Sequence, residues 1–312
     1  MLDLYKLQIF SVVVREGSFS AAAERLYMTQ SAVSQHIKDL ETSLGRRLFE
    51  RGWRGVKLTP HGEVLNRYAA EIFDLVAQAE SALMDIEHLT SGRVNIGATP
   101  GIGIYLAPDW VQEFRSRYPQ LMVALHTGIT SQIIGDVLAQ KLNIGFIEGE
   151  LDDRPQPRLA SLVLADIEQQ VVVGLKHPFW DRDKVGIEEL SGQSLIVRQP
   201  GSQSRIWLDH ALQQHGVEPA IGVEFDNLES IKRAVTGGAC MAVLPPYVVQ
   251  SEVEQCLLRM IPVEGRPFTR SLKLVWDSQA RFSPVTRAFL AALGRHYPAL
   301  NALLNKEEML SP

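Results

Sequence analysis

The stretch that decides the fold is residues 18–44, which read SFSAAAERLYMTQSAVSQHIKDLETSL. Apolar residues recur at helical spacing in two runs, so the stretch predicts two short helices joined by a tight turn. Small alanines in the first run would let the two helices cross closely. Thr29 lies where the second helix begins and is expected to cap it. The positions expected to be buried are Ala22, Ala23 and Leu26 in the first helix, and Val33, Ile37 and Leu40 in the second.

The second predicted helix also has a polar face of hydroxyl and amide side chains with one cation. Such side chains pair with base edges in the major groove of DNA, and cations contact phosphates. For any single residue, the alternative is an ordinary solvated helix face. Because the pair of helices has the pattern of a helix-turn-helix, we expect DNA contacts from Gln30, Ser31, Ser34, Gln35 and Lys38.

A short basic segment follows the two helices. Residues 51–59 read RGWRGVKLT, with two glycines and three cations among apolar residues. This composition predicts a β-hairpin of the kind that forms the wing of a winged helix. Wing cations contact phosphate or the minor groove. We therefore expect Arg51, Arg54 and Lys57 to bind DNA, with Arg54 the best candidate for the minor groove.

A long helix is predicted to begin at Thr59-Pro60, a capping residue followed by proline, and to continue to about residue 90. Apolar residues recur along it alternately three and four positions apart, which is the a/d pattern of a coiled coil. The pattern favours dimerisation, and the alternative is a helix packed on its own domain. The predicted seam comprises Leu65, Tyr68, Ile72, Leu75, Ala79, Ala82, Ile86 and Leu89.

Length and composition fit a globular protein of two or three domains, with 312 residues, 46% hydrophobic and 21% charged. The net charge is −5, but residues 1–60 hold nine basic and six acidic residues, so a basic head precedes an acidic body. The two cysteines and eight histidines lack metal-ligand spacing. No catalytic motif, apolar run of membrane-spanning length or secretory signal is present. We therefore expect no enzyme activity, cofactor, metal or membrane contact, and a cytoplasmic location.

After residue 91, strand and helix patterns alternate in two halves, which predicts an α/β region with an open, mostly parallel sheet. The whole chain resembles the LysR-type transcriptional regulators. The resemblance is carried by FSAAA at 19–23, TQSAVSQ at 29–35, LF at 48–49 and LTP at 58–60, and in the body by RQPGS at 198–202 and VLP at 243–245.

The resemblance implies a winged helix-turn-helix head, a dimerising linker helix and an effector domain folded like the periplasmic substrate-binding proteins. It also implies double-stranded operator DNA and a small-molecule effector as partners, with dimers that join into a tetramer; contact with RNA polymerase stays open. The expected bounds are 1–60 for the head, 61–90 for the linker and 91–312 for the effector domain. Within that domain, subdomain I covers about 93–164 and 268–312, and subdomain II about 165–267.

Three loops are expected to converge beyond the carboxyl ends of the predicted strands, where open α/β sheets bind ligands. Their glycines and hydroxyls offer donors to a small carboxylate, sulfite-like or phosphate-like anion, although each loop could equally be an ordinary helix cap. Glu148 would repel an anion or bind an amine. The candidate effector residues are Thr99, Pro100, Gly101, Thr127, Gly128, Thr130, Glu148, Gly201, Ser202, Gln203, Ser204 and Phe225.

Two other classes of function stay open at this point. One is a solute-binding protein or enzyme built on the two-lobed fold, against which the head at residues 1–60 and the lack of a signal peptide count. The other is a DNA-architectural protein that ignores ligands. Thermal stabilisation by a small metabolite would exclude the second.

Overall fold

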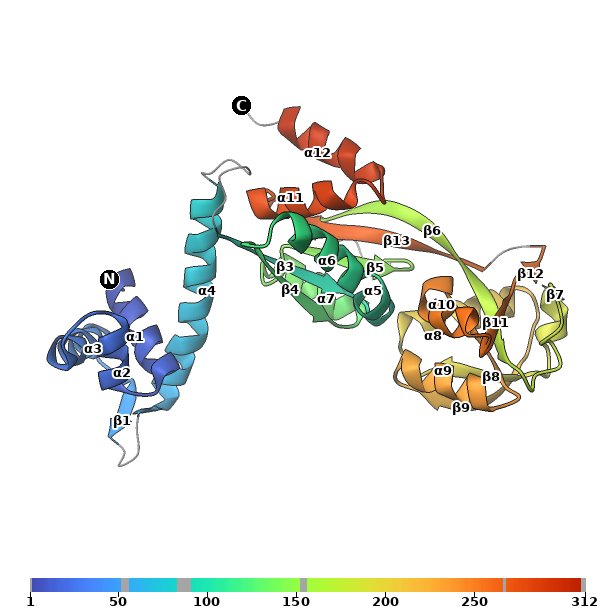
Figure 1. Ribbon diagram of the computed structural model, residues 1–312, viewed down its shortest axis with the longest axis horizontal. Coiled ribbons are helices and arrows are strands. Elements are labelled where there is room, and N and C mark those ends of the chain that lie inside the picture. Colours follow the sequence, from blue (N-terminus) through green and yellow to red (C-terminus); the bar gives the residue numbers. More distant parts are fainter. Residues whose placement is uncertain (1, 52–55, 83–90, 152–155, 266–267, 310–312) are drawn as a thin grey trace. The chain divides into compact units, whose positions relative to one another are not determined.

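The computed structural model describes residues 2–51, 56–82, 91–151, 156–265 and 268–309 (Figure 1). The chain divides into two compact units, Met1–Leu83 and Met84–Pro312. Among the described residues, no helix is both long and apolar enough to cross a membrane. The predicted fold class is confirmed: a helix-turn-helix head is followed by an α/β region with a mixed sheet.

The N-terminal unit is built on local signals that the sequence carries. Ser18 and Thr29 begin α2 and α3 by accepting backbone N–H groups. Gly17 and Gly45 end α1 and α3 in the left-handed conformation, which glycine adopts most easily. The elements are α1 Leu4–Glu16, α2 Phe19–Arg25, α3 Gln30–Leu44, β1 Phe49–Arg51, β2 Val56–Leu58 and α4 Pro60–Ala82.

The core of this unit buries the apolar positions predicted in α2 and α3, except that Leu26 is only partly buried. Phe10 of α1 fills the centre and is fully buried. The Glu41 side chain accepts the backbone N–H of Leu48 at 2.7 Å, which fixes the turn after α3. The hairpin β1–β2 then leads directly into α4.

The linker helix α4 is described as far as Ala82, and the predicted seam residues Ile86 and Leu89 lie outside the described residues. Contrary to the expectation for them, Leu65 and Ile72 pack against the core of the head. Tyr68 and Leu75 are 58% and 66% exposed. Part of the apolar face of α4 therefore packs on its own unit, and a narrower apolar stripe stays exposed.

The C-terminal unit has two lobes. Lobe I holds the parallel strands β3 Arg93–Ala98, β4 Met122–Thr127 and β5 Ile144–Glu148. Its core lies between this sheet and the helices that cover it, and contains the fully buried Phe114, Phe146 and Phe289. The helices are α5 Pro100–Tyr105, α6 Ala107–Arg117, α7 Thr130–Leu138, α11 Pro284–Leu293 and α12 Ala299–Met309.

Lobe II repeats the arrangement with parallel pairing of β8 to its neighbours β9 and β10. Apolar residues fill both faces of its sheet, in one core against α8 and another against α9 and α10. The elements are β7 Val185–Gly186, a 3₁₀ helix Ile187–Leu190, β8 Ser194–Arg198, α8 Gln203–Gln214, β9 Ala220–Phe225, α9 Leu228–Gly237, β10 Met241–Leu244, α10 Pro246–Glu254, β11 Leu258–Ile261 and β12 Val263–Glu264.

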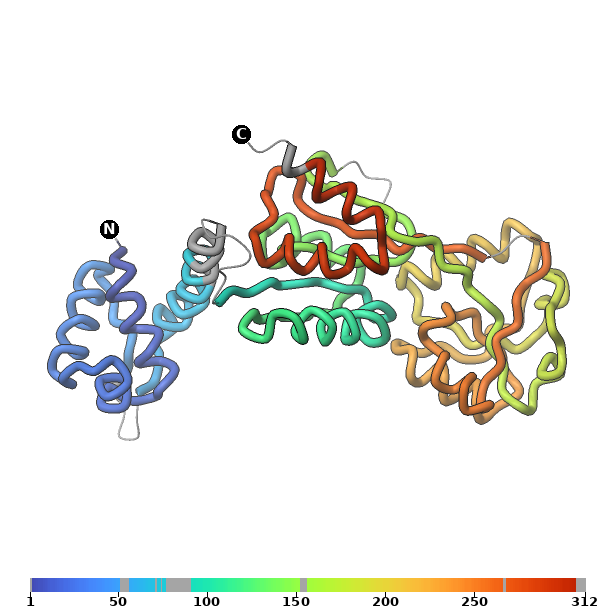
Figure 2. The backbone as a smooth tube through the Cα atoms, turned by 45° about the horizontal axis from the view of Figure 1, so that its top comes forward, coloured from blue at the N-terminus to red at the C-terminus, as the bar shows by residue number. Residues whose placement is uncertain are grey.

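Two long strands run between the lobes, β6 Leu159–Gly174 and β13 Phe268–Asp277. They pair with each other in antiparallel fashion from Leu159 to Gln169 (Figure 2). Strand β13 also pairs with β5 in lobe I, whereas the end of β6 pairs with β10 and β11 in lobe II. The resulting strand order is β4-β3-β5-β13-β6-β10-β8-β9. The two lobes are therefore joined by a continuous hydrogen-bonded connection.

We predict that Gly62→Ala destabilises the N-terminal unit by about 1–3 kcal/mol, the usual cost of overpacking. A Cβ at this position of α4 would lie 2.2 Å from the backbone oxygen of Leu48, which cannot easily move. Hydrogen exchange of the full chain, read on peptides from α1 and α3, would measure the loss. Gly135→Ala is the control, because its Cβ would meet nothing within 4 Å. Equal protection of α1 and α3 in both variants would contradict the prediction.

Candidate functional site

The predicted DNA-facing residues lie together on one side of α3. Gln30, Ser31, Gln35 and Lys38 are exposed and Ser34 is partly buried, while the opposite side of the helix is in the core. Gln30 donates to the Ser34 hydroxyl at 2.9 Å. Gln35 likewise donates to Asp39 at 2.8 Å. The helix thus presents amide and hydroxyl groups that can exchange these exposed bonds for base edges.

The wing is described only in part. Strands β1 and β2 form the predicted hairpin, with Arg51 paired in register with Val56. Lys57 is exposed and lies 3.9 Å from Glu50. Arg54, the candidate for the minor groove, lies outside the described residues.

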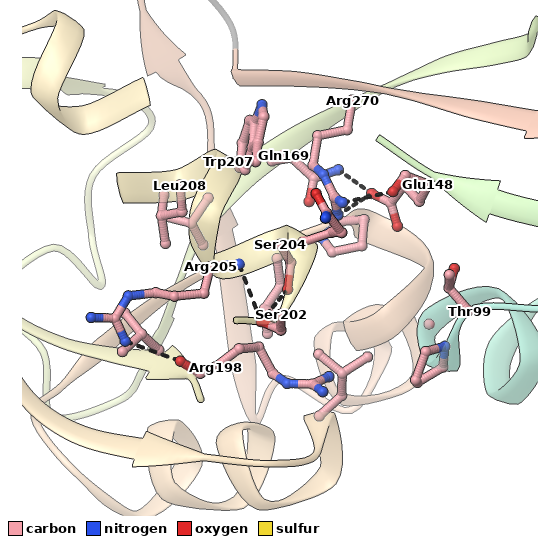
Figure 3. A pocket seen from close by; sticks show the side chains of 18 of the residues that line it. Thr99, Glu148, Gln169, Arg198, Ser202, Ser204, Arg205, Trp207, Leu208 and Arg270 are labelled. Carbon is pink, nitrogen blue, oxygen red and sulfur yellow. Dashed lines mark hydrogen bonds and ion pairs between the residues drawn. The ribbon is translucent and has the colours of Figure 1, made fainter. Parts of the chain in front are cut away.

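The C-terminal unit contains a cavity of about 100 Å³ between its lobes (Figure 3). Eight of the predicted effector residues line it, and they come from the carboxyl ends of strands and from the starts of the helices that follow, in both lobes. These eight are Thr99, Pro100, Gly101, Thr130, Glu148, Ser202, Gln203 and Ser204.

Four predicted residues do not line this cavity. The Thr127 methyl group packs against Gly103, and Gly128 donates its N–H to the Ala98 carbonyl. Gly201 makes the exposed turn before α8, with a φ of 82°. Phe225 is partly buried and packs against the core beside α9. Thr127 and Gly128 lie three and two residues before Thr130, so the loop prediction was close, but these two residues do not reach the cavity wall.

The Glu148 carboxylate is fully engaged by protein groups. One of its oxygens accepts Gln169 at 2.8 Å and lies 3.3 Å from an Arg270 nitrogen, and both charged residues are 7% exposed. The other oxygen accepts the Tyr247 hydroxyl. Glu148 is therefore neither a free charge that repels an anion nor a free ligand for an amine. Burial, followed by the nearby carboxylate, raises the pKa of Tyr247 well above its ordinary value, so its hydroxyl stays a donor.

The geometry around Arg270 depends on a glycine. Arg270 donates to the Glu148 backbone carbonyl at 2.7 Å and lies over the Trp207 ring at 5.4 Å. Gly149 has a φ of 101°, and a Cβ there would lie 2.7 Å from the same guanidinium. A residue with a side chain at this position would therefore displace Arg270.

Two more arginines from lobe II line the cavity. Arg205 donates to Asp209 and Glu224 at 2.8 and 2.7 Å, and also to the Arg198 carbonyl. Figure 3 shows its guanidinium extending away from Thr99, whereas that of Arg198 extends towards Thr99 of lobe I. Arg198 makes no ion pair within the described part of the chain, and its Nε is buried without a hydrogen-bond partner.

Sequence reasoning missed most of the wall. Arg198 was noted only as part of a family motif, and Gln169 and Arg270 lie within the long strands where no loop signal marks them. The apolar wall comes from helices and strand ends of lobe II with one residue of lobe I. The missed lining residues are Ile129, Gln169, Ile196, Val197, Arg198, Arg205, Trp207, Leu208, Leu228, Ile231, Val243, Leu244, Pro245 and Arg270.

A second polar contact joins the lobes outside the cavity wall. Tyr105 of α5 donates to Glu229 of α9 at 2.5 Å. Lys232, buried at 6% exposure, pairs with Glu229 and Glu252 at 3.0 and 2.8 Å and lies 4.9 Å from the Tyr105 ring centre. Burial, followed by the bond to Glu229, raises the pKa of Tyr105 above its ordinary value of 10.

Comparison with known proteins matches both units of the chain. A model of the bacterial regulatory helix-turn-helix proteins of the lysR family matches residues 4–63, and a model of the LysR substrate binding domain matches residues 87–298. The chain is 34% identical over 288 residues to a probable RuBisCO transcriptional regulator of Cyanidioschyzon merolae, covering 90% of this chain and 95% of that protein. A protein of the same description from Porphyra purpurea is 32% identical, with 92% and 91% covered.

Solved structures show the same fold at lower identity. A cysteine mutant of OxyR from Corynebacterium glutamicum aligns with a TM-score of 0.69 at 21% identity, covering 99% of this chain and 96% of that chain. CbnR in complex with its target DNA aligns with a TM-score of 0.63 at 18% identity, covering 94% and 99%.

We predict that Glu148→Ala lowers the free energy of unfolding by about 3–5 kcal/mol, because it leaves the buried Arg270 charge without its partner. Urea unfolding of the full chain, followed by circular dichroism, would measure the change. The exposed pair Lys184–Glu264 supplies the control, since Glu264→Ala should cost less than about 1 kcal/mol. Similar decreases in the free energy of unfolding in the two variants would show that the buried pair stabilises the chain no more than the exposed pair does.

We predict that Tyr105→Phe destabilises the C-terminal unit by about 1–2 kcal/mol at neutral pH. It should also make the stability less dependent on alkaline pH. Because folding raises the pKa of Tyr105, this tyrosine ionises first in the unfolded chain. Its contribution to the free energy of unfolding is therefore complete below pH 10 and is lost as the pH rises above that value. Urea midpoints at neutral pH and at about pH 11 would test this. An unchanged alkaline dependence would refute the role of Tyr105.

Proposed function

We propose that this chain, which belongs to the LysR family of transcriptional regulators, binds operator DNA through its head and is controlled by a small anionic effector held between its two lobes. The part of the proposal that concerns the effector rests on the cavity. It lies between lobes that are joined by paired strands, and it is lined from both sides. A ligand that binds the two walls together would favour one arrangement of the lobes over another.

The DNA half rests on the exposed face of α3 and on the hairpin. Gln30, Ser31, Ser34 and Gln35 would read bases in the major groove, and Lys38 would contact phosphate. Arg51, Arg54 and Lys57 would add wing contacts to phosphate or the minor groove. Two such heads on a two-fold dimer would require half-sites related by symmetry and separated by helical turns of DNA.

The oligomer would form through α4. Tyr68 and Leu75 leave an exposed apolar stripe on this helix, which a second copy of the chain would cover in a homodimer. The family resemblance adds pairing of dimers into a homotetramer. The relatives described as probable RuBisCO transcriptional regulators suggest that the target genes encode RuBisCO.

The experiment is footprinting of the full chain on two duplexes, its own upstream intergenic DNA and the DNA upstream of the RuBisCO genes of the source genome. Protected half-sites spaced by about one helical turn, or by multiples of it, would support the regulator proposal. Protection that shifts on addition of a metabolite extract would support effector control. Binding without protection of any defined site, or an unchanged footprint with every metabolite, would favour a ligand-independent architectural protein.

On the protected operator, we predict distinct effects for two neighbouring residues of α3. Gln35→Ala should cost about 1–3 kcal/mol at the operator and leave the salt dependence intact, as expected for a base contact. Lys38→Ala should weaken binding to all sequences alike and reduce the salt slope by about 1, as expected for a phosphate contact.

Fluorescence anisotropy at several salt concentrations would measure both effects. Gln8→Ala, at an exposed position of α1, is the control. Identical salt slopes for Lys38→Ala and Gln8→Ala would remove Lys38 from the interface.

A further inference from the structure

The three arginines that line the cavity differ in how much of their charge is already paired. Arg270 is paired with Glu148, and Arg205 with Asp209 and Glu224. Arg198 forms no ion pair within the described ranges, and its Nε is buried and unpartnered. Asp226 lies close enough to oppose the lowering of the Arg198 pKa by burial, but does not pair with it. One guanidinium therefore remains available to a ligand.

The backbone around Arg198 is held in place, so the side chain has a fixed base. Arg198 is the last residue of β8, in register with Phe225 of β9. Its carbonyl accepts Arg205 at 3.0 Å, and the next residue, Gln199, donates its N–H to the Phe225 carbonyl. Rigid support of this kind allows a binding group to meet its ligand at little further entropic cost.

The other uncommitted groups on the wall are hydroxyl and amide groups, which both donate and accept hydrogen bonds, and a guanidinium nitrogen, which only donates. The side chains of Thr99, Thr130 and Gln203 make no hydrogen bond within the part of the chain that the structure describes, and the Arg270 Nε is buried without a partner. The lining carboxylate, Glu148, has both oxygens occupied. Unpartnered guanidinium nitrogens beside a satisfied carboxylate favour an oxyanion, and the free hydroxyl and amide side chains can pair with hydroxyl groups of the same ligand.

We infer that Arg198 is the residue that selects the effector, and that the effector is a small organic oxyanion with hydroxyl groups. The inference deepens the proposed function by naming the chemical class and the recognising residue. A guanidinium pairs in bidentate fashion with either a carboxylate or a phosphate. The hydroxyls of the ligand would meet Thr99, Thr130 and Gln203. The ligand would lie in the cavity of about 100 Å³ between the lobes.

Isothermal titration calorimetry on the full chain with three related compounds tests this assignment. Glycerate carries a carboxylate, glycerol 3-phosphate carries a phosphate, and glycerol has the same carbon skeleton and hydroxyls without a charge. We expect one or both oxyanions to bind, with the stronger binder identifying the anionic group, and glycerol not to bind.

Variants then connect binding to Arg198. Arg198→Gln should raise the Kd by at least about tenfold, and Arg198→Lys should give an intermediate value because an ammonium lacks the planar fork. The matched control is Arg182→Gln, which removes the same charge from an exposed arginine of lobe II paired with Glu189. Its Kd should equal that of the parent chain. Melting temperatures without ligand verify that each variant is folded.

Three results would overturn the assignment: no binding of either oxyanion to the parent chain, equal binding by the parent and Arg198→Gln, or equal weakening by Arg198→Gln and Arg182→Gln. None of these outcomes depends on DNA. If footprinting succeeds and the calorimetry fails, the regulator proposal stands without Arg198. If the calorimetry succeeds and no DNA site is protected, the ligand assignment stands and the regulator proposal fails.

Discussion

The ligand-binding half of the chain depends on the buried pair of Glu148 and Arg270, which lies where the strands pass from one lobe to the other. Two charges at this depth are costly unless every polar atom finds a partner. Gln169, Tyr247 and the Glu148 carbonyl supply most of those partners, and they come from both lobes and from the strands between them. The two residues therefore form part of the cavity wall, and their opposite charges compensate each other.

This cancellation decides the electrostatics of the remaining wall. If Glu148 were free, the cavity would carry a negative charge beside a positive one and would suit an amine or a zwitterion. With Glu148 paired, the charge that remains for a ligand is that of Arg198 on lobe II. The Tyr105–Glu229 bond and Lys232 satisfy one another at the second contact between lobes. Under the proposed function, the Tyr105–Glu229 contact would hold the lobes together and Arg198 would recognise the ligand.

The head was predictable from sequence because its signals are local. Thr29 caps α3, Gly45 ends it, and the apolar spacing assigns its buried side. The loops at strand ends were predictable for a related reason, since the carboxyl edge of a parallel sheet collects them. The sequence patterns do not locate the start of β6 at Leu159, because the first part of this strand is only partly buried and mixes polar with apolar residues.

Residues that depend on long-range pairing could not be predicted in the same way. Gln169 and Arg270 meet because β6 and β13 pair across the chain, which no local pattern reveals. The division between α5 and α6 falls at Leu106, just before Pro108, whose ring removes a backbone donor. In α4 the apolar spacing was read correctly, yet spacing cannot tell whether Leu65 faces a partner or its own head.

Gly149 shows how a residue without a side chain can set a ligand preference. Its missing Cβ leaves the space in which Arg270 reaches the Glu148 carbonyl. A larger residue would crowd that guanidinium and disturb its ion pair with Glu148, which would leave more negative charge at the cavity wall. Divergence of effector class among related chains therefore need not begin at a charged or polar position. Under the proposed function, it could begin at a glycine outside the cavity lining, through the ion pair that the glycine permits.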